Sequence, residues 1–195
     1  MLLPLLRSQV QGDLLSLLFL HPEDEFSLSE IARFVGASLP AVHHEVTRLI
    51  NSGLLLDRRQ GNVRLVRADM SSVLASPLSE LMAVTYGPRA VLVDVLTDVE
   101  GVEAAYIYGS WAARYRGQPG SVPGDVDLLV VGEADIDDLE EAVRPAQARL
   151  RRQVNVRRVS PATWRQAQSG DGAPFLATLL ASPLVELELR GGVAA

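Results

Sequence analysis

Two aspartates, Asp125 and Asp127, head an apolar run in the second half of the chain, GDVDLLVVG. Side chains two residues apart in a strand project from the same face, so these carboxylates are expected side by side. Adjacent carboxylates repel each other unless a cation lies between them, and oxygen ligands suit magnesium. On its own the pattern is more typical of the solvated start of a strand, so its meaning depends on the elements around it.

Gly109 and Ser110 lie where a strand expected at 102–108 passes into a helix. Glycine lets a phosphate approach the backbone closely, and a helix start with a serine hydroxyl offers hydrogen-bond donors and partial positive charge. Arg114, about one helical turn further on, is another candidate for a phosphate contact, although a solvated charge at a helix end fits it equally well. Gly-Ser alone is more often a simple helix cap.

Strands and helices alternate through this half of the chain, which indicates an α/β or α+β domain over residues 85–195. The expected strands are 102–108, 126–131, 154–159 and 184–189. The expected helices are 89–96, a short one from Ser110, 136–151, 161–168 and 174–181.

The order strand, Gly-Ser, helix, Pro/Gly-rich loop and Asp-x-Asp heading an apolar strand resembles the nucleotidyltransferase superfamily of the polymerase-beta type. The minimal bacterial branch, with antitoxin and antibiotic-modifying members, is the most similar, and the resemblance spans about residues 102–159. It implies that Gly109 and Ser110 hold the phosphates of a nucleoside triphosphate. It also implies that Asp125 and Asp127 are catalytic and bind Mg²⁺ or Mn²⁺, whose charge stabilises transfer of a nucleotidyl group.

Asn155 departs from the pattern of this superfamily. Active members carry a third carboxylate on the following strand, where this chain reads QVNVR. An amide binds a metal through its carbonyl oxygen but is a poor base, so we expect nucleotide and metal binding with weak or absent transfer. The alternative is an active enzyme that modifies a hydroxyl of a protein, an RNA or a small molecule, with Glu186 or Glu188 replacing the missing carboxylate.

The first half of the chain is expected to form helices followed by a hairpin. Ser27 and Glu30 have the spacing of a capping box, Gly36 is suited to end that helix, and Ser38 can cap the next one. Two apolar strands then flank a polar turn that contains Gly61-Asn62, which is typical of a hairpin. Further helices are expected at 14–20 and 70–82.

This order, over residues 14–69, resembles the winged-helix domains of small bacterial repressors, including the arsenic-repressor type. The resemblance implies a DNA-binding domain at residues 1–84 and double-stranded DNA as a partner. The third helix would read the major groove and the hairpin would meet phosphates or the minor groove. The candidate DNA-binding residues are Ser38, His43, His44, Thr47, Arg48, Arg58, Arg59 and Arg64.

Winged helices also dimerise or dock proteins, so a homodimer, a toxin or a modification target are alternative partners. We therefore expect a transcriptional regulator with a nucleotide-binding second domain. The net charge of -6 excludes a generally basic nucleic-acid coat and leaves only local patches for DNA. With no cysteine and no run of roughly 20 apolar residues, thiolate chemistry, disulfides and a membrane span are not expected, and the expected location is the cytoplasm.

Overall fold

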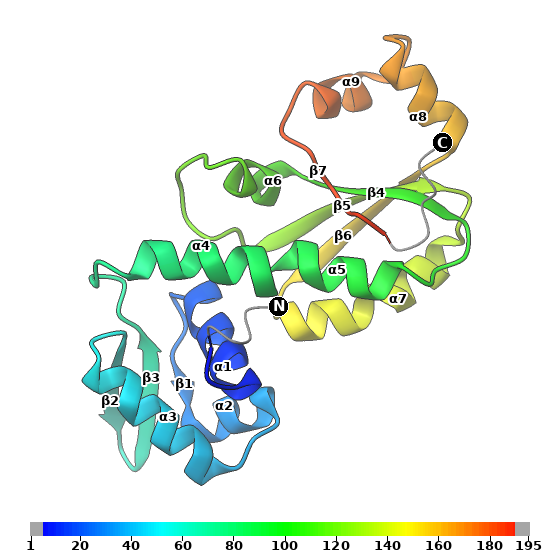
Figure 1. The fold of residues 1–195 in the computed structure, drawn as a ribbon. Helices are drawn as coiled ribbons and strands as arrows, with labels where there is room; N and C mark the ends of the chain where they lie inside the picture. Colours follow the sequence, from blue (N-terminus) through cyan, green and yellow to red (C-terminus); the bar gives the residue numbers. More distant parts are fainter. Residues whose placement is uncertain (1–5, 190–195) are drawn as a thin grey trace. The chain divides into compact units, whose positions relative to one another are not determined.

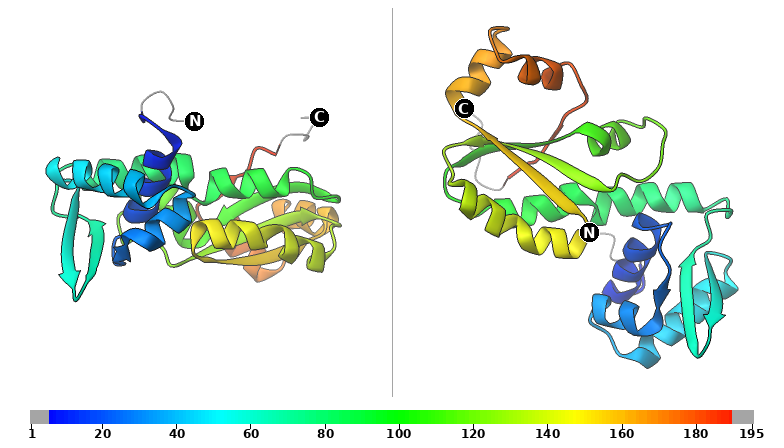
Figure 2. Two further views of the ribbon diagram at one scale, coloured as in Figure 1. Left: turned by 90° about the horizontal axis from the view of Figure 1, so that it is seen from below. Right: turned by 180° about the vertical axis from the view of Figure 1, so that it is seen from behind.

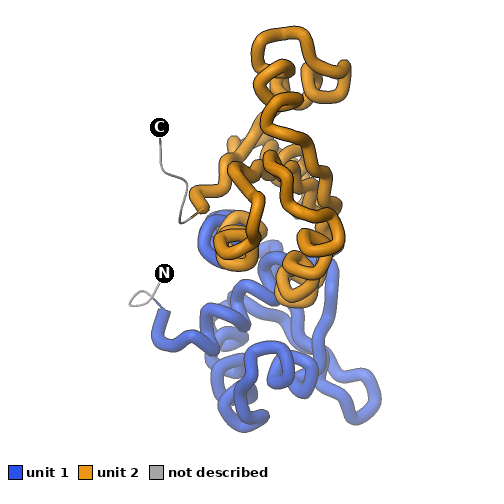
Figure 3. The backbone as a smooth tube through the Cα atoms, turned by 90° about the vertical axis from the view of Figure 1, so that its right-hand side faces the viewer, with its two compact units in different colours: residues 1–87 blue, residues 88–195 orange. Residues whose placement is uncertain are grey.

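The computed structural model describes residues 6–189, and the chain divides into two compact units, residues 1–87 and 88–195 (Figure 3). The boundary expected after residue 84 falls inside helix α4 (Ala75–Tyr86), and the units instead divide between Gly87 and Pro88. The last turn of α4 stays with the first unit because the Tyr86 hydroxyl occupies the space beside Gly12, where any larger residue would collide with it.

The described part of the first unit combines four helices with a small antiparallel sheet of order β1-β3-β2 (Figure 1). Its elements are α1 (Gln9–Leu20), β1 (Phe26–Ser27), α2 (Leu28–Val35), α3 (Leu39–Asn51), β2 (Leu55–Gln60), β3 (Val63–Ala68) and α4. The core contains fully buried apolar residues at helical spacing on α1 and α3, together with β3 residues such as Val66.

The local signals read from the sequence are confirmed here. Ser27 and Glu30 form the expected capping box, and Gly36 ends α2 in the left-handed conformation, with φ 62°. The Ser38 side chain accepts a hydrogen bond from the backbone of Ala41 at the start of α3.

Two of the expected helices have different limits. Helix α1 begins at Gln9 rather than at Leu14, because Ser8 caps it. The connecting helix expected at 70–82 begins at Ala75, because Asp69 accepts hydrogen bonds from the backbone and hydroxyl of Ser71 and holds a turn there.

The second unit is built on a mixed sheet of order β6-β5-β4-β7. Its elements are α5 (Pro88–Leu96), β4 (Val102–Tyr108), α6 (Gly109–Tyr115), β5 (Asp125–Gly132), α7 (Ile136–Leu150), β6 (Gln153–Val159), α8 (Pro161–Gln168), α9 (Pro174–Leu180) and β7 (Val185–Glu186). Helices α5 and α7 lie on one side of this sheet, and α8 and α9 lie on the other (Figures 1 and 2). The chain is therefore mixed α/β, as expected.

Strand β5 is the centre of this unit, antiparallel to β4 and parallel to β6. Its later residues are buried on both faces, whereas Asp125 is exposed and Asp127 is half-buried. The register pairs Asp127 with Tyr108 on one side and with Asn155 on the other. Paired residues on neighbouring strands project from the same face, so these three side chains share one face of the sheet.

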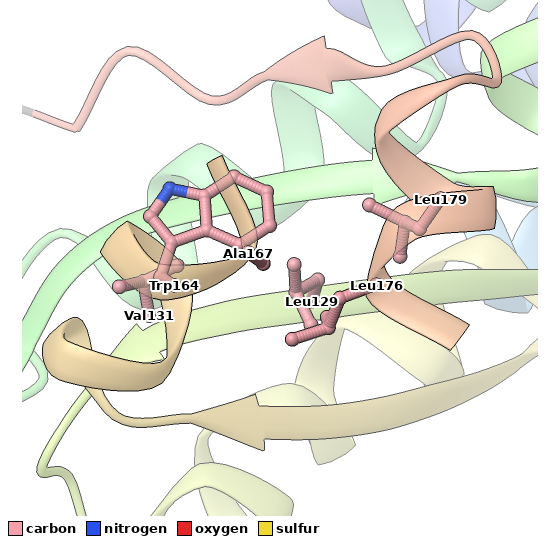
Figure 4. Packing of buried hydrophobic residues seen from close by; sticks show 6 residues of the cluster. All are labelled: Leu129, Val131, Trp164, Ala167, Leu176 and Leu179. Atoms are coloured by element: carbon pink, nitrogen blue, oxygen red, sulfur yellow. The ribbon is translucent and has the colours of Figure 1, made fainter. Parts of the chain in front are cut away.

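Helices α8 and α9 cover the opposite end of that same face. Figure 4 shows Leu129 and Val131 of β5 packed under Trp164 and Ala167 of α8 and under Leu176 and Leu179 of α9. The last strand is shorter than the expected 184–189, because only Val185 and Glu186 pair with β4. No helix within residues 6–189 has the length and apolar character needed to cross a membrane.

Candidate functional site

The carboxylates of Asp125 and Asp127 are joined by a single amide. Asn155 Nδ2 lies 2.9 Å from Asp125 Oδ2 and 3.1 Å from Asp127 Oδ1, so it donates to both side chains. The shared face expected for the two aspartates is therefore confirmed. The parallel pairing of β5 with β6 sets Asn155 directly opposite Asp127, at the position where the resemblance to nucleotidyltransferases implies a third acid.

This arrangement leaves the negative charge of the two carboxylates uncompensated. Ionised carboxylates only accept hydrogen bonds, so the amide must present its NH₂ group to them when no cation is bound. Two N–H dipoles reduce the repulsion between the carboxylates but supply no net positive charge. A cation would add that charge, and the amide could then turn its carbonyl oxygen to it.

The described residues fit a magnesium ion that is shared with a ligand rather than one held by protein alone. Within residues 6–189 no group of three or more His, Cys, Asp or Glu side chains is placed to hold a metal. Mg²⁺ commonly takes one or two carboxylates, several waters and substrate phosphates, which matches two aspartates and an amide oxygen.

The glutamates suggested as replacements for the third carboxylate do not join this group. Glu188 forms an ion pair with Arg89, with Nη2 and Oε1 2.9 Å apart. Glu186 pairs in register with Tyr106 on the side of β4 that faces away from β5. Strand β4 lies between β7 and β5, which carries the two aspartates. Neither glutamate therefore forms part of a three-carboxylate cluster in the described chain.

Gly109 brings the start of α6 against Asp127. It has φ 68°, a conformation that favours glycine, and a Cβ atom added there would lie 2.5 Å from Asp127 Oδ2. Ser110, the next residue, is exposed, and the helix that they begin has no side-chain cap. The structure thus brings together four of the residues that the sequence singled out: Gly109, Ser110, Asp125 and Asp127.

Arg114 holds the loop between α6 and β5. Its Nη1 donates to the carbonyl of Gln118, and a Cβ atom at Gly120 would lie 2.8 Å from its guanidinium. Arg152 holds the other end of this loop, since its Nε lies 2.6 Å from the carbonyl oxygen of Pro123. The polar contact of Arg114 in this structure is therefore with the loop, and its expected contact with phosphate stays a prediction.

Three residues beside the carboxylates were not singled out from the sequence. The Arg157 guanidinium lies 4.1 Å from the centre of the Phe175 ring, and the Tyr108 ring lies edge-on to Phe175 with centroids 6.0 Å apart. Burial raises the pKa of Tyr108, as does the charge of Asp127, while Arg157 opposes both. Arg157 could have been found from the sequence, because side chains alternate along β6 and residues 155 and 157 therefore project from the same face.

In the first unit, the structure brings Arg64 of β3 to helix α3. Arg64 Nη1 lies 3.4 Å from His43 Nε2 and 3.4 Å from Thr47 Oγ1. Arg59 is the cross-strand partner of Arg64, so the two arginines share a face of the hairpin. His43 and His44 are both exposed, whereas Ser38 serves as the helix cap described above.

Most of the candidate DNA-binding arginines already pair with acids of the same unit. Arg64 Nε lies 2.6 Å from Asp57 Oδ2, and Arg48 pairs with Glu45 on the same helix. The pairs with Glu25 join residues distant in sequence: Arg58 Nε lies 2.9 Å from Glu25 Oε1, and Arg67 lies 3.9 Å from the same atom. The hydrogen bond from Arg58 lowers the pKa of Glu25.

Arg59 differs from these neighbours. It is exposed on β2, and among residues 6–189 no acid pairs with it. The positive charge that this surface offers to a phosphate without rearrangement is therefore smaller than the number of arginines indicates.

Comparison of the chain with protein-family models, curated proteins and solved structures finds no match. Its function has to be argued from the geometry of these two groups of residues.

Proposed function

We propose that residues 88–195 form a nucleotide-binding domain of the nucleotidyltransferase type, in which Asp125 and Asp127 hold Mg²⁺ or Mn²⁺ against the phosphates of a nucleoside triphosphate. The observation that carries this proposal is the contact of one Asn155 nitrogen with both carboxylates, at 2.9 and 3.1 Å. Such a nitrogen occupies the place between two carboxylates that a cation would take.

The position of Gly109 supports a phosphate ligand beside that cation. The backbone at the start of α6 lies so close to Asp127 that no side chain fits between them. A phosphate that reaches the exposed N–H groups of this turn and the Ser110 hydroxyl would also be adjacent to the carboxylates. Divalent cations bind strongly where carboxylate and phosphate oxygens meet, so the two halves of the site support each other.

We further propose that this domain binds nucleotide more effectively than it transfers a nucleotidyl group. Activation of an attacking hydroxyl needs a base, and the amide of Asn155 cannot accept that proton. Within the described chain no third carboxylate joins Asp125 and Asp127. The alternative remains an active enzyme that modifies a hydroxyl of a protein, RNA or small molecule and relies on the metal to lower the pKa of that hydroxyl.

For the first unit we propose a winged-helix DNA-binding role, which makes the whole chain a cytoplasmic transcriptional regulator that responds to a nucleotide. This role is supported by the exposed histidines of α3, by Arg64 beside them and by Arg59, with which no acid among residues 6–189 pairs. Docking of a protein, such as a toxin or a second copy, is the competing role. The exposed apolar residues Leu56 and Val63 on the hairpin favour it.

Titration calorimetry tests the central proposal. Wild-type protein should bind Mg²⁺ together with a nucleoside triphosphate, and the Asp125→Ala/Asp127→Ala variant should not. Asp137→Ala/Asp138→Ala, which removes the same charge from the exposed start of α7, is the matched control and should bind normally. Absence of nucleotide affinity in the wild type would refute the proposal. Incubation with labelled nucleoside triphosphates tests the alternative, because rapid transfer would show that Asn155 does not limit the reaction.

A further inference from the structure

We propose that Arg157, Phe175 and Tyr108 form a subsite for the nucleobase of the bound nucleotide, with a preference for purines. This inference rests on the function proposed above, because it assumes that the phosphates and the cation lie at Asp125 and Asp127. It adds the part of the ligand that these three side chains contact and the chemical class of that part.

The sheet register places the subsite directly beside the carboxylates. Tyr108 is paired with Asp127 across β4 and β5, and Arg157 follows Asn155 by two residues on β6. All four side chains therefore project from one face of the sheet. Phe175, on the first turn of α9, reaches the same place from above, because its ring contacts both Arg157 and Tyr108.

The packing of α8 and α9 makes Phe175 the border of the open part of this face. Beyond it, Leu129 is buried beneath Leu176, Leu179 and Trp164 (Figure 4). Phe175 itself remains 37 % exposed, although its side chain is large and apolar. A ligand bound at the carboxylates would thus meet an aromatic ring held on a packed helix, rather than more of the buried core.

The chemistry of these residues suits a planar, polar heterocycle. An aromatic ring and a guanidinium plane both stack on bases, and stacking is stronger for the larger purine surface. In its cation–π contact with Phe175, the Arg157 guanidinium keeps its N–H edge available for acceptor atoms of a base, such as the oxygen and nitrogen of a guanine edge. A phosphate, by contrast, would gain nothing from the Phe175 ring.

Several other arginines of this unit already have polar partners, whereas no acid of the described chain pairs with Arg157. Arg89 and Arg149 pair with acids, and Arg114, Arg152 and Arg158 donate to backbone carbonyls. Among residues 6–189 Arg157 pairs with no carboxylate, even though Asp127 influences the same tyrosine. Arg157 contacts the Phe175 ring instead, so a ligand can bind its guanidinium without breaking an ion pair.

The test compares ligands that share phosphates but differ in the base. Calorimetry with Mg²⁺ would measure binding of ATP, GTP, UTP and inorganic tripolyphosphate to the wild type and to the variants Phe175→Ala, Phe175→Leu and Arg157→Gln. Phe175→Leu keeps an apolar side chain on α9 without a ring, so it separates loss of stacking from loss of packing. Arg165→Gln, on the exposed side of α8, is the matched control for the loss of a positively charged side chain in Arg157→Gln.

The wild type should bind ATP and GTP more tightly than UTP. All three subsite variants should bind the purine nucleotides at least about tenfold more weakly, in line with the stacking contribution of one base. Their affinity for tripolyphosphate should be unchanged, and Arg165→Gln should behave as wild type.

Two results would overturn this inference alone. The first is an equal loss of affinity for tripolyphosphate and for nucleotide, which would make Arg157 a phosphate ligand. The second is unchanged affinity for nucleotide in all three variants. Failure of the wild type to bind any nucleotide or tripolyphosphate would instead refute the proposed function, and the subsite with it.

Discussion

In residues 6–87 the arginines proposed to face DNA lie against carboxylates of their own unit, whereas in residues 88–189 the carboxylates proposed to face a cation lie against an uncharged amide. Arg58 and Arg64 illustrate the first case, with Glu25 and Asp57 as partners. Asp125 and Asp127 illustrate the second, with Asn155 between them. A phosphate entering the first surface replaces existing ion pairs, but a cation entering the second site supplies charge that is missing.

This difference bears on how strongly each site selects its ligand. Exposed ion pairs contribute little to stability, so DNA phosphates can displace them, but each displacement reduces the net gain in affinity. Two carboxylates that share only an uncharged amide lose no ion pair when a cation binds, so the attraction to the cation is not reduced in this way. We therefore expect the second unit to respond more sharply to single substitutions than the first.

The largest effect is expected from Gly109→Ala, which should abolish binding of magnesium and nucleotide. The new Cβ would collide with Asp127 Oδ2, and the left-handed backbone adds about 1–2 kcal/mol of strain. Gly117→Ala is a close control, because Gly117 has φ 77° and no atom within 4 Å of an added Cβ. Thermal unfolding should show a lower Tm for both variants, because both place alanine in a left-handed conformation. Calorimetry should show loss of magnesium and nucleotide binding only for Gly109→Ala. Normal binding by Gly109→Ala would separate Gly109 from the site.

Asn155→Asp should produce the next largest effect, by making the stability of the second unit depend on divalent cations. The substitution removes an amide that donates to two carboxylates and adds a third negative charge, so in EDTA the unfolding free energy should fall by about 1 kcal/mol. Magnesium should then raise Tm more than it does in the wild type, and any transferase activity should increase.

Asn155→Ala provides the comparison for Asn155→Asp, because it removes the amide without adding charge. A Tm that responds equally to magnesium in both variants would show that a third carboxylate does not join the cation site.

A smaller effect, of opposite sign, is expected in the first unit. Glu25→Gln should increase the affinity for duplex DNA several-fold and steepen its salt dependence, because Arg58 and Arg67 lose their acidic partner. Glu23→Gln makes the same change in net charge at an exposed residue of the same loop and should have less effect. Fluorescence anisotropy at several salt concentrations measures the DNA affinity of each variant and its salt dependence. Equal affinities for the two variants would argue against contact between Arg58 and DNA.

The smallest effect should distinguish two adjacent arginines. Arg59→Ala should weaken duplex binding more than Arg58→Ala, because Arg58 must leave Glu25 before it meets a phosphate. Loss of one phosphate contact lowers the slope of log affinity against log salt by about 1. The same anisotropy titration would contradict this ranking if Arg58→Ala were the weaker binder. If neither variant differed from the wild type, protein docking would become the better interpretation of the first unit.

The sequence predicts those features of the two sites that depend on local spacing. The two-residue period places Asp125 and Asp127 on one face, and the resemblance to nucleotidyltransferases implies that Asn155, on the following strand, lies beside them. Capping at Ser27 and termination at Gly36 are likewise local, since they depend on side chains within a few residues of the backbone groups that they satisfy.

The missed features depend on tertiary pairing. Glu25 meets Arg58 because β1 adds to β3 at the edge of the hairpin, and nothing near Glu25 in sequence indicates that pairing. Phe175 meets Arg157 because α9 returns over the sheet, which an apolar helix pattern does not specify. The position of β7 at the far edge, which removes Glu186 from the site, is a matter of strand order and is not encoded in any single segment.

The loop between α6 and β5 has a consequence for how chains of this kind can vary in length. Arg114 holds its first part through Gln118, and Arg152 holds its last part through Pro123. Residues added or removed between those two anchors would extend or shorten an exposed arch without moving Gly109 or Asp125 at its ends. Insertions and deletions among homologous chains are therefore expected to gather at residues 121 and 122, after Gly120, which leaves no room for a side chain beside Arg114. The same segment is suitable for inserting a peptide tag or a fluorescent reporter next to the proposed nucleotide site.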